Sequence, residues 1–356
     1  MRSRRTTRTL AALAVLTTVS ALAACGSSSD DSASGPASEL RLGYFANVTH
    51  AAALIGVQQG FIQDELGEGT TLTTQVFNAG PDEVEALFAG GLDAAYIGPS
   101  PTINAYAQSN GDAIRIISGA ASGGAQLVVR DGIDTPDDLR GTTLASPQLG
   151  NTQDVALRTW LTSQGLANSV DGGGDVTITP TKNSDILSLF ASGDLDGAWV
   201  PEPYASDLVL DEGAHVLVDE ADLWPEGRFV TTQLIVRTEF LQQHPETVDA
   251  LLRANVESVQ FADSDPTAAQ AAVNDGLVAA GGSALDDAVL QRAWSNLTVT
   301  YDPVATALAQ SAQNAVEAGT TADEVDLDGI YDLAPLNAIL EEQGLDPVSS
   351  DGLGTE

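Results

Sequence analysis

LFAGGLDAAYIGPSP at residues 87–101 and LFASGDLDGAWVPEP at residues 189–203 share one local design, and this repetition decides the fold. Each stretch combines a helix end, a glycine turn, a short strand that begins at Leu-Asp, and a loop bounded by prolines. In open α/β sheets, ligands bind beyond the carboxyl ends of the strands. Two such units that face each other therefore predict a cleft between two similar lobes.

The surrounding chain alternates short β-rich runs with amphipathic helices, which is typical of βαβ units and a mostly parallel sheet. Strands are expected at 40–44, 71–77, 92–97, 114–118, 126–130, 142–146, 176–179, 195–200, 216–219 and 229–237. Helices are expected at 50–66, 82–89, 101–108, 152–164, 184–191 and 204–210, and the pattern after Thr238 is almost purely helical.

These elements predict an α/β chain of two lobes with a two-strand hinge and a helical C-terminal tail. The strands at 126–130 and 229–237 are expected to carry the chain into the second lobe and back, because both are apolar and both end in Arg. The first lobe is then formed by residues 40–126 and 233–356, and the second by residues 127–232. The helical tail should pack on the first lobe.

The first 24 residues have the composition of an export signal. They carry four arginines, no acidic residue, and an apolar run from Leu10 to Ala24 that is shorter than the roughly 20 apolar residues of a membrane span. LAAC at 22–25 resembles the lipobox of bacterial lipoproteins, in which the cysteine, here Cys25, carries the lipids. Residues 25–39 then predict a flexible tether. The alternative for this only cysteine is a free thiol beside a cleavage site.

The charge of the chain excludes one class of partner. The formal net charge is −36, and loss of the four signal arginines takes it to −40. Nucleic acids are bound through Lys and Arg that neutralise phosphates. We therefore expect no nucleic-acid partner. From the export signal and the lipobox we expect the chain at the extracytoplasmic face of the bacterial cell membrane, and we expect it to be a monomer.

Helix starts after strand ends offer the candidate ligand site. Their free N–H groups and the positive end of the helix dipole bind anions without Lys or Arg. The alternative at each position is a plain helix cap or loop. The expected ligand-binding residues are Asn47, Thr49, His50, Ser100, Thr102, Ser122, Gly123, Gly150, Asn151, Thr152, Trp199, Glu202, Tyr204 and Thr232.

Catalytic motifs are missing from the sequence. There is no Gly-x-Ser-x-Gly elbow, no Walker loop and no His-x-x-x-His pair. The three histidines, His50, His215 and His244, are dispersed, so a metal triad is not expected. The sequence therefore predicts a binding protein, with no cofactor and no metal, in place of an enzyme.

Six motifs in order resemble the substrate-binding lipoproteins of ABC importers in the sulfonate, nitrate and taurine group. They are LGYFANVTH at 42–50, FNAGP at 77–81, GPSP at 98–101, GAASGG at 119–124, PQLGNTQD at 147–154 and WVPEP at 199–203. The resemblance runs from Leu40 to about Gly344, and aliphatic sulfonate binders are the most similar. It implies a type II periplasmic-binding-protein fold that delivers a small anion to a membrane permease driven by an ATPase.

Several ligands stay open at this point. Nitrate is small for a site with Trp199 and Tyr204, and the ammonium of taurine would need Glu202 or Asp154 as its partner. The same aromatic and acidic residues would suit a cationic pyrimidine precursor of thiamine through cation–π stacking. Other possibilities are a sensory partner of a membrane receptor and an enzyme similar to the pyrimidine synthases of thiamine biosynthesis, which depend on His and a Cys-rich stretch.

Overall fold

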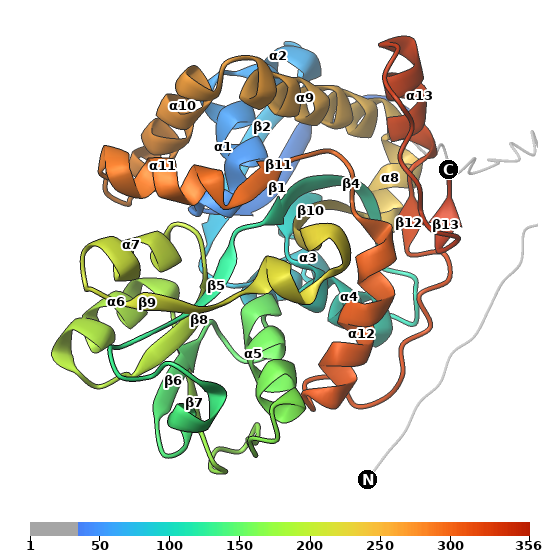
Figure 1. Ribbon diagram of the computed structural model, residues 1–356. Coiled ribbons are helices and arrows are strands. Elements are labelled where there is room, and N and C mark those ends of the chain that lie inside the picture. Colours follow the sequence, from blue (N-terminus) through green and yellow to red (C-terminus); the bar gives the residue numbers. More distant parts are fainter. Residues whose placement is uncertain (1–34) are drawn as a thin grey trace, which may run out of the picture. The chain divides into compact units, whose positions relative to one another are not determined.

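Two β-sheets with helices packed on their faces form the described part of the chain, residues 35–356 of a computed structural model (Figure 1). The predicted export signal, Cys25 and the first part of the predicted tether lie outside the described residues. The prediction that the tether extends to residue 39 is wrong. Ala37 is buried, its N–H donates to Thr247 Oγ1 at 2.8 Å, and the first strand begins at Glu39.

The first sheet has the strand order β13-β12-β4-β10-β3-β1-β2, with β11 paired to β4. Strands β1, β2 and β3 are parallel, whereas β10 is antiparallel to both β3 and β4. The bounds are β1 Glu39–Phe45, β2 Thr71–Phe77, β3 Ala94–Ile97, β4 Ile114–Gly123, β10 Val230–Arg237, β11 Leu297–Val299, β12 Tyr331–Asp332 and β13 Gly354–Thr355.

The second sheet has the order β7-β6-β8-β5-β9. Strands β6, β7 and β8 are parallel, and β5 is antiparallel to β8 and β9. The bounds are β5 Ala125–Val129, β6 Thr143–Ser146, β7 Thr177–Pro180, β8 Gly197–Pro201 and β9 His215–Asp219. We call each sheet with its packed helices a lobe, the first lobe for the larger sheet and the second lobe for this one.

Ten predicted strands and most predicted helices occur close to their expected positions. The α-helices are α1 Ala51–Gln58, α2 Phe61–Leu66, α3 Gly80–Phe88, α4 Pro99–Gln108, α5 Thr152–Ser163, α6 Asn183–Ser192, α7 Tyr204–Leu210, α8 Thr238–Gln243, α9 Pro245–Ser264, α10 Pro266–Ala279, α11 Asp287–Ser295, α12 Leu308–Glu317 and α13 Ala334–Glu342. Short 3-10 turns include η1 Val48–His50, η3 Glu220–Leu223, η4 Pro225–Gly227 and η5 Ala305–Ala307.

Two predictions of regular structure need correction. The helix expected at 50–66 is two helices, because the chain turns at Gly60 with a left-handed φ of 83°. The tail after Thr238 is not purely helical, because β11, β12 and β13 join the first sheet. Its helices α9 and α10 pack on α1 and α2 of the first lobe, as predicted, while α11 and α12 also contact α7 and α5 of the second lobe.

The chain crosses between the sheets at two neighbouring places. Only Gly124 separates β4 from β5, and the return strand β10 begins at Val230. The two crossings lie side by side, since the Gly123 N–H donates to the Phe229 carbonyl at 3.3 Å. This arrangement is the two-strand hinge predicted from the sequence, displaced by a few residues from the predicted boundaries.

The repeated design occupies equivalent places in the two sheets. Strand β3 lies between α3 and α4 along the chain, and β8 lies between α6 and α7 (Figure 1). Gly98 follows β3 and Pro201 ends β8, so both lie at the carboxyl end of a strand. None of the helices in the described residues has the length and apolar character needed to cross a membrane.

Candidate functional site

A small cavity lies between the two lobes, where the carboxyl ends of β1, β3, β6, β7 and β8 meet. Its volume is about 20 Å³, which is room for one water molecule. We call it the interlobe cavity. Its walls come from both lobes, with Phe45, Asn47, Thr49, His50, Gly98 and Thr231 from the first and Asn151, Thr152, Gln153, Asn183 and Pro201 from the second.

Two helices of the second lobe begin at this cavity. The first amides with a backbone acceptor are Asp154 in α5, which donates to Asn151 O at 3.1 Å, and Asp185 in α6, which donates to Lys182 O at 2.9 Å. The earlier amides, those of Thr152, Gln153 and Asn183, have no acceptor among the described residues. Both helices therefore turn the positive ends of their dipoles and free N–H groups toward the cavity.

Two side chains on the cavity wall lack hydrogen-bond partners. Thr152 is 8% exposed and Asn183 is 6% exposed, and neither Thr152 Oγ1 nor Asn183 Oδ1 has a partner among the described residues. A buried polar group without a partner costs about 1–3 kcal/mol, so native proteins rarely keep one without a reason. A polar ligand in the cavity would supply the missing partner.

His50 contributes a neutral imidazole to the wall. It is buried, its ring stacks on Phe45 with centroids 4.5 Å apart, and its Nδ1 accepts the Phe45 N–H at 3.2 Å. Burial lowers the pKa of His50 to about 3. Because Nδ1 is the acceptor, the proton of the neutral ring is on Nε2, which is therefore a donor.

The chemistry of the wall is uniform. The lining residues include no Lys, Arg, Asp or Glu, and His50 is neutral. What they offer is hydroxyls, amides, one imidazole N–H and helix amides. Such a set binds an anion by directed hydrogen bonds and helix dipoles, without a buried counter-charge.

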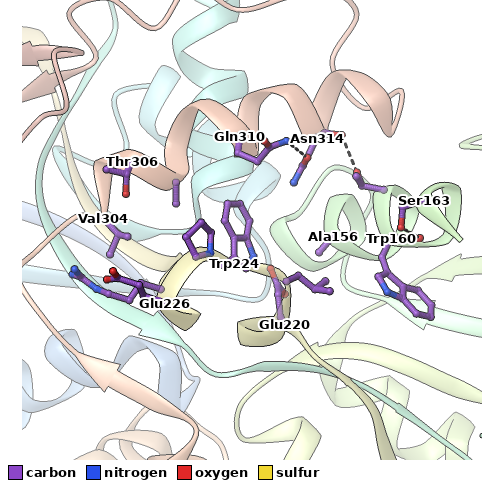
Figure 2. Close-up of a pocket in the computed structure, with 15 residues that line it drawn as sticks. Ala156, Trp160, Ser163, Glu220, Trp224, Glu226, Val304, Thr306, Gln310 and Asn314 are labelled. Carbon is purple, nitrogen blue, oxygen red and sulfur yellow. Dashed lines mark hydrogen bonds between the residues drawn. The ribbon is translucent and has the colours of Figure 1, made fainter.

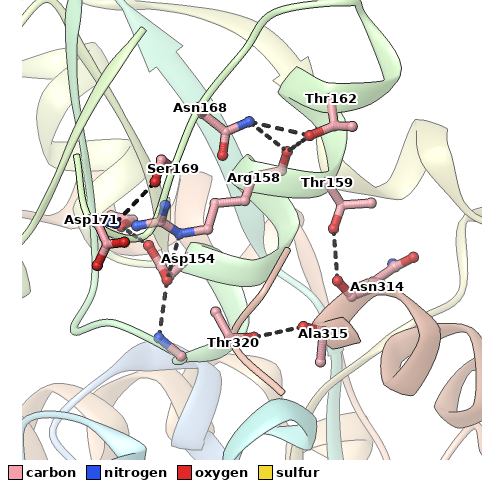
Figure 3. A network of polar contacts seen from close by, with 12 residues as sticks. Asp154, Arg158, Thr159, Thr162, Asn168, Ser169, Asp171, Asn314, Ala315 and Thr320 are labelled. Carbon is pink, nitrogen blue, oxygen red and sulfur yellow. Dashed lines mark hydrogen bonds and ion pairs between the residues drawn. The ribbon is translucent and has the colours of Figure 1, made fainter. Parts of the chain in front are cut away.

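Asp154 has a structural role behind the cavity, not the role of an amine ligand. It is fully buried, and its carboxylate accepts Ser146 Oγ at 2.6 Å, Gly150 N at 3.0 Å and Arg158 Nε at 3.0 Å (Figure 3). Gly150 has a φ of 78°, which favours glycine. Asp154 thus fixes the turn that leads into α5 and thereby positions Thr152.

Glu202 joins the lobes and does not line the cavity. It is 0% exposed, and its carboxylate accepts Ser206 N at 3.0 Å, Arg292 Nη1 at 3.1 Å and Asn296 Nδ2 at 2.6 Å. Arg292 and Asn296 belong to α11 and its C-terminal end, so this network ties the first lobe to the end of β8. Glu202 accepts the Ser206 N–H in the first turn of α7, which is the helix-cap alternative to a contact with a ligand amine.

Trp199 and Tyr204, both expected at the site, do not line the interlobe cavity. Trp199 is 0% exposed, packs against Trp160 and donates from Nε1 to Glu220 Oε2 at 2.8 Å. Tyr204 packs against a core cluster of the second lobe. In β8 all five residues are buried, and only the last of them, Pro201, borders the interlobe cavity.

The other predicted site residues fall into two groups, those that line the interlobe cavity and those that do not. The cavity brings together Asn47, Thr49, His50, Asn151 and Thr152, but it leaves out Ser100, Thr102, Ser122, Gly123, Gly150 and Thr232. Thr102 Oγ1 is used by its own helix, since it donates to Gly98 O at 2.8 Å. Thr231, the neighbour of Thr232, lines the cavity and donates to Gly123 O at 2.5 Å.

A second and larger cavity lies at the hinge (Figure 2). This hinge cavity has a volume of about 720 Å³ and is walled by α5, by η3 and η4, and by η5 and α12; its lining includes Trp160, Glu220, Trp224, Glu226 and Arg228. Its one cation, Arg228, is paired with Asp302 at 2.5 Å. With Arg228 neutralised by Asp302, the carboxylate of Glu226 has no free cation beside it and repels an anion, so the hinge cavity is the poorer candidate for an anionic ligand.

Glu220, on the wall of the hinge cavity, gives the first prediction. Burial raises the pKa of Glu220 from 4.5 to about 7. Between pH 4.5 and about 7 the folded protein therefore keeps a proton that the unfolded chain releases. The contribution of this group to the free energy of unfolding is fully present below pH 4.5 and is lost as the pH rises through about 7. We expect Glu220→Gln to stabilise the protein at pH 8, by about 3 kcal/mol at most, because each pKa unit is about 1.4 kcal/mol.

The check is urea unfolding of both proteins at pH 4, 6 and 8. The difference in free energy of unfolding between Glu220→Gln and the parent should grow with pH. A difference that is the same at all three pH values would contradict the raised pKa of Glu220. The variant must be compared with the parent at each pH, because the lowered pKa of His50 acts in the opposite direction, removing stability as the pH falls below about 6.5.

The described residues also contain no candidate metal site. Within residues 35–356, no three or more His, Cys, Asp or Glu side chains are grouped to hold a metal ion.

Comparisons with known proteins agree with this fold. A model of the NMT1-like family matches residues 33–274. The taurine-binding periplasmic protein of Escherichia coli (strain K12) is 27% identical over 195 residues, which cover 54% of this chain and 58% of that protein. A Bacillus subtilis (strain 168) protein named as an aliphatic sulfonates-binding protein is 26% identical over 239 residues, 65% of this chain and 68% of that protein.

Among solved structures, the alkanesulfonate-binding protein SsuA from Xanthomonas axonopodis pv. citri, bound to MOPS, has a TM-score of 0.69. It is 19% identical, and the match covers 82% of this chain and 97% of SsuA. At this identity the likeness establishes the shared two-sheet α/β fold. The relatives quoted are binding proteins, which confirms the prediction of a binding protein in place of an enzyme.

Proposed function

Because the chain belongs to the NMT1-like family, we propose that it is the extracytoplasmic substrate-binding component of an ABC importer. In this proposal it captures a small organic anion, with an aliphatic sulfonate as the preferred ligand, and delivers it to a permease driven by a cytoplasmic ATPase. A lipid on Cys25 holds the protein, a monomer, at the outer face of the membrane. The names of the relatives support this assignment.

One observation carries the choice of an anion. The interlobe cavity offers only neutral donors, and two of its buried side chains, Thr152 and Asn183, lack partners at the starts of two helices. A sulfonate is tetrahedral, permanently charged and rich in acceptor oxygens. Hydroxyls and amides from both lobes can each donate a hydrogen bond to one of those oxygens. The bound ligand would then connect the two lobes.

Binding requires motion of the lobes. The cavity has room for about one water molecule, so the walls must separate to admit an organic anion and then close on it. A ligand shifts this equilibrium only by binding the closed form more tightly than the open form. Contacts from both lobes to one sulfonate provide that difference, and the permease would recognise the closed form.

The alternatives fit this cavity less well. A cationic pyrimidine would need a carboxylate and an aromatic face, but Glu202, Trp199 and Tyr204 all lie outside the cavity wall. A sensory role would use the same site, and neighbouring genes for a permease or a kinase would distinguish the two. No constellation for pyrimidine synthesis is found among the lining residues.

A thermal-shift panel tests the proposal. The purified protein is heated with ethanesulfonate, taurine, nitrate, methylphosphonate and a cationic aminopyrimidine, since a ligand at 100 times its Kd stabilises by about 2.7 kcal/mol. We expect a response to sulfonates that Thr152→Val abolishes, with the unfolding temperature of the free protein little changed. A response to the aminopyrimidine alone would overturn the proposal.

Gly150→Val is unsuitable as a companion variant. The left-handed φ of Gly150 would strain a valine, and the residue touches the cavity only through the turn that Asp154 holds. Asn183→Leu is the better second variant, because it removes the other unpartnered group and keeps a similar volume. Unchanged sulfonate binding in both variants would exclude this cavity as the site.

A further inference from the structure

The interlobe cavity offers almost no apolar wall. Of its lining side chains only Phe45 and Pro201 are apolar, and the ring of Phe45 is stacked against His50. Sites for apolar ligand bodies are lined mainly by hydrophobic and aromatic side chains. An alkyl or aryl tail placed here would lie against the buried side chains of Asn47, Thr49 or Gln153 and leave these polar groups without a partner.

The cavity also has no partner for an ammonium. Its lining contains no carboxylate. The two carboxylates that the sequence suggests for this role are already used, Asp154 by Gly150, Ser146 and Arg158, and Glu202 by Ser206, Arg292 and Asn296. An ammonium buried here would lose its hydration and face the positive ends of α5 and α6.

The closed arrangement of the two lobes also leaves little space for a ligand. The lobes approach closely where Gly98 of the first lobe faces Thr152 of the second, since a Cβ on Gly98 would lie 2.3 Å from Thr152 Oγ1. Even the smallest sulfonate must widen a cavity of about 20 Å³. Every methylene added to the ligand widens it further and moves the two helix starts away from the sulfonate.

We propose that this site selects compact sulfonates, with one or two carbons and no ammonium, against longer alkanesulfonates and against taurine. This selectivity rests on the proposed function, because it concerns the same cavity. It assigns the specificity to the all-polar wall formed by Asn47, Thr49, Gln153 and Asn183. The exclusion of taurine follows from the missing carboxylate, and the exclusion of long chains from the missing apolar surface.

Isothermal titration calorimetry with a ligand series tests the selectivity. The purified protein is titrated with methanesulfonate, ethanesulfonate, butanesulfonate and hexanesulfonate, and with taurine, which is ethanesulfonate with an added ammonium. We expect the Kd to rise at least about tenfold from ethanesulfonate to butanesulfonate and again to hexanesulfonate, and taurine to bind at least about tenfold more weakly than ethanesulfonate, since tenfold is only 1.4 kcal/mol.

A variant on the wall separates selectivity from simple loss of binding. Gln153 lines the cavity and makes no side-chain hydrogen bond with another described residue, so Gln153→Ala widens the cavity without breaking such a bond. In this variant butanesulfonate should approach the affinity of ethanesulfonate, while taurine stays weak. Butanesulfonate or taurine binding as tightly as ethanesulfonate to the parent protein would overturn the inference, whereas no binding of any sulfonate would overturn the proposed function itself.

Discussion

Gly98→Ala is expected to hold the two lobes apart and to weaken sulfonate binding by about a hundredfold or more, which corresponds to roughly 2.7 kcal/mol. The backbone of Gly98 has a φ of −74° and a ψ of 163°, which alanine adopts without strain. The added Cβ, however, would lie 2.3 Å from Thr152 Oγ1 and 3.4 Å from the Thr231 carbonyl oxygen. The cost therefore falls on the closed form, in which Gly98 and Thr152 meet across the cavity.

Titration calorimetry gives the loss of affinity, and small-angle X-ray scattering with saturating ligand gives the loss of closure. Thr152→Ala removes the clashing oxygen, so Gly98→Ala combined with Thr152→Ala serves as the matched control. The double variant should bind ethanesulfonate about as tightly as Thr152→Ala alone, because the clash with Gly98→Ala is gone and both proteins lack the Thr152 hydroxyl. If Gly98→Ala closes normally and keeps its affinity, the lobes do not meet at this point in the bound state.

Asp154→Ala is expected to cost about 3–5 kcal/mol of the free energy of unfolding, because it leaves a buried arginine without its ion partner. Arg158 is 1% exposed, and its Nη1 already lacks a hydrogen-bond partner among the described residues. The same change frees Ser146 and the amide of Gly150 from the carboxylate that holds them (Figure 3). The turn into α5 should loosen, so sulfonate affinity should fall together with stability.

Urea unfolding measures the loss, and a double variant separates its causes. Asp154→Leu with Arg158→Met replaces the buried ion pair by apolar groups, an exchange that is often neutral or stabilising in other proteins. It should recover most of the stability lost in Asp154→Ala but little of the affinity, because the Gly150 turn still lacks its acceptor. A loss below about 1 kcal/mol in Asp154→Ala would mean that the ion pair contributes little here.

The architecture was predictable because its signals are local. Alternating short strands and helices, and the design repeated at 87–101 and 189–203, predict two lobes whose sheets contain parallel strands with their carboxyl ends facing each other. The short strands β11, β12 and β13 were missed because two or three residues carry no periodicity, and they form only by pairing with β4 and with each other.

The site was predictable only where helix starts follow strand ends. That rule found Asn151 and Thr152, and the same rule applied to Pro180-Thr181-Lys182-Asn183 would have found Asn183. Trp199 lies outside the cavity because β8 is buried along its whole length, which a place near a strand end does not reveal. The ion pair of Glu202 could not be predicted, because its partner Arg292 is 90 residues away along the chain.

The most direct test of the central claim is a crystal structure of the protein grown with ethanesulfonate. The account predicts closed lobes with the sulfonate in the interlobe cavity, its oxygens within hydrogen-bonding distance of the Thr152 hydroxyl, the Asn183 side chain and the first free amides of α5. Ethanesulfonate bound in the hinge cavity, or an interlobe cavity that stays empty at saturating ligand, would contradict it.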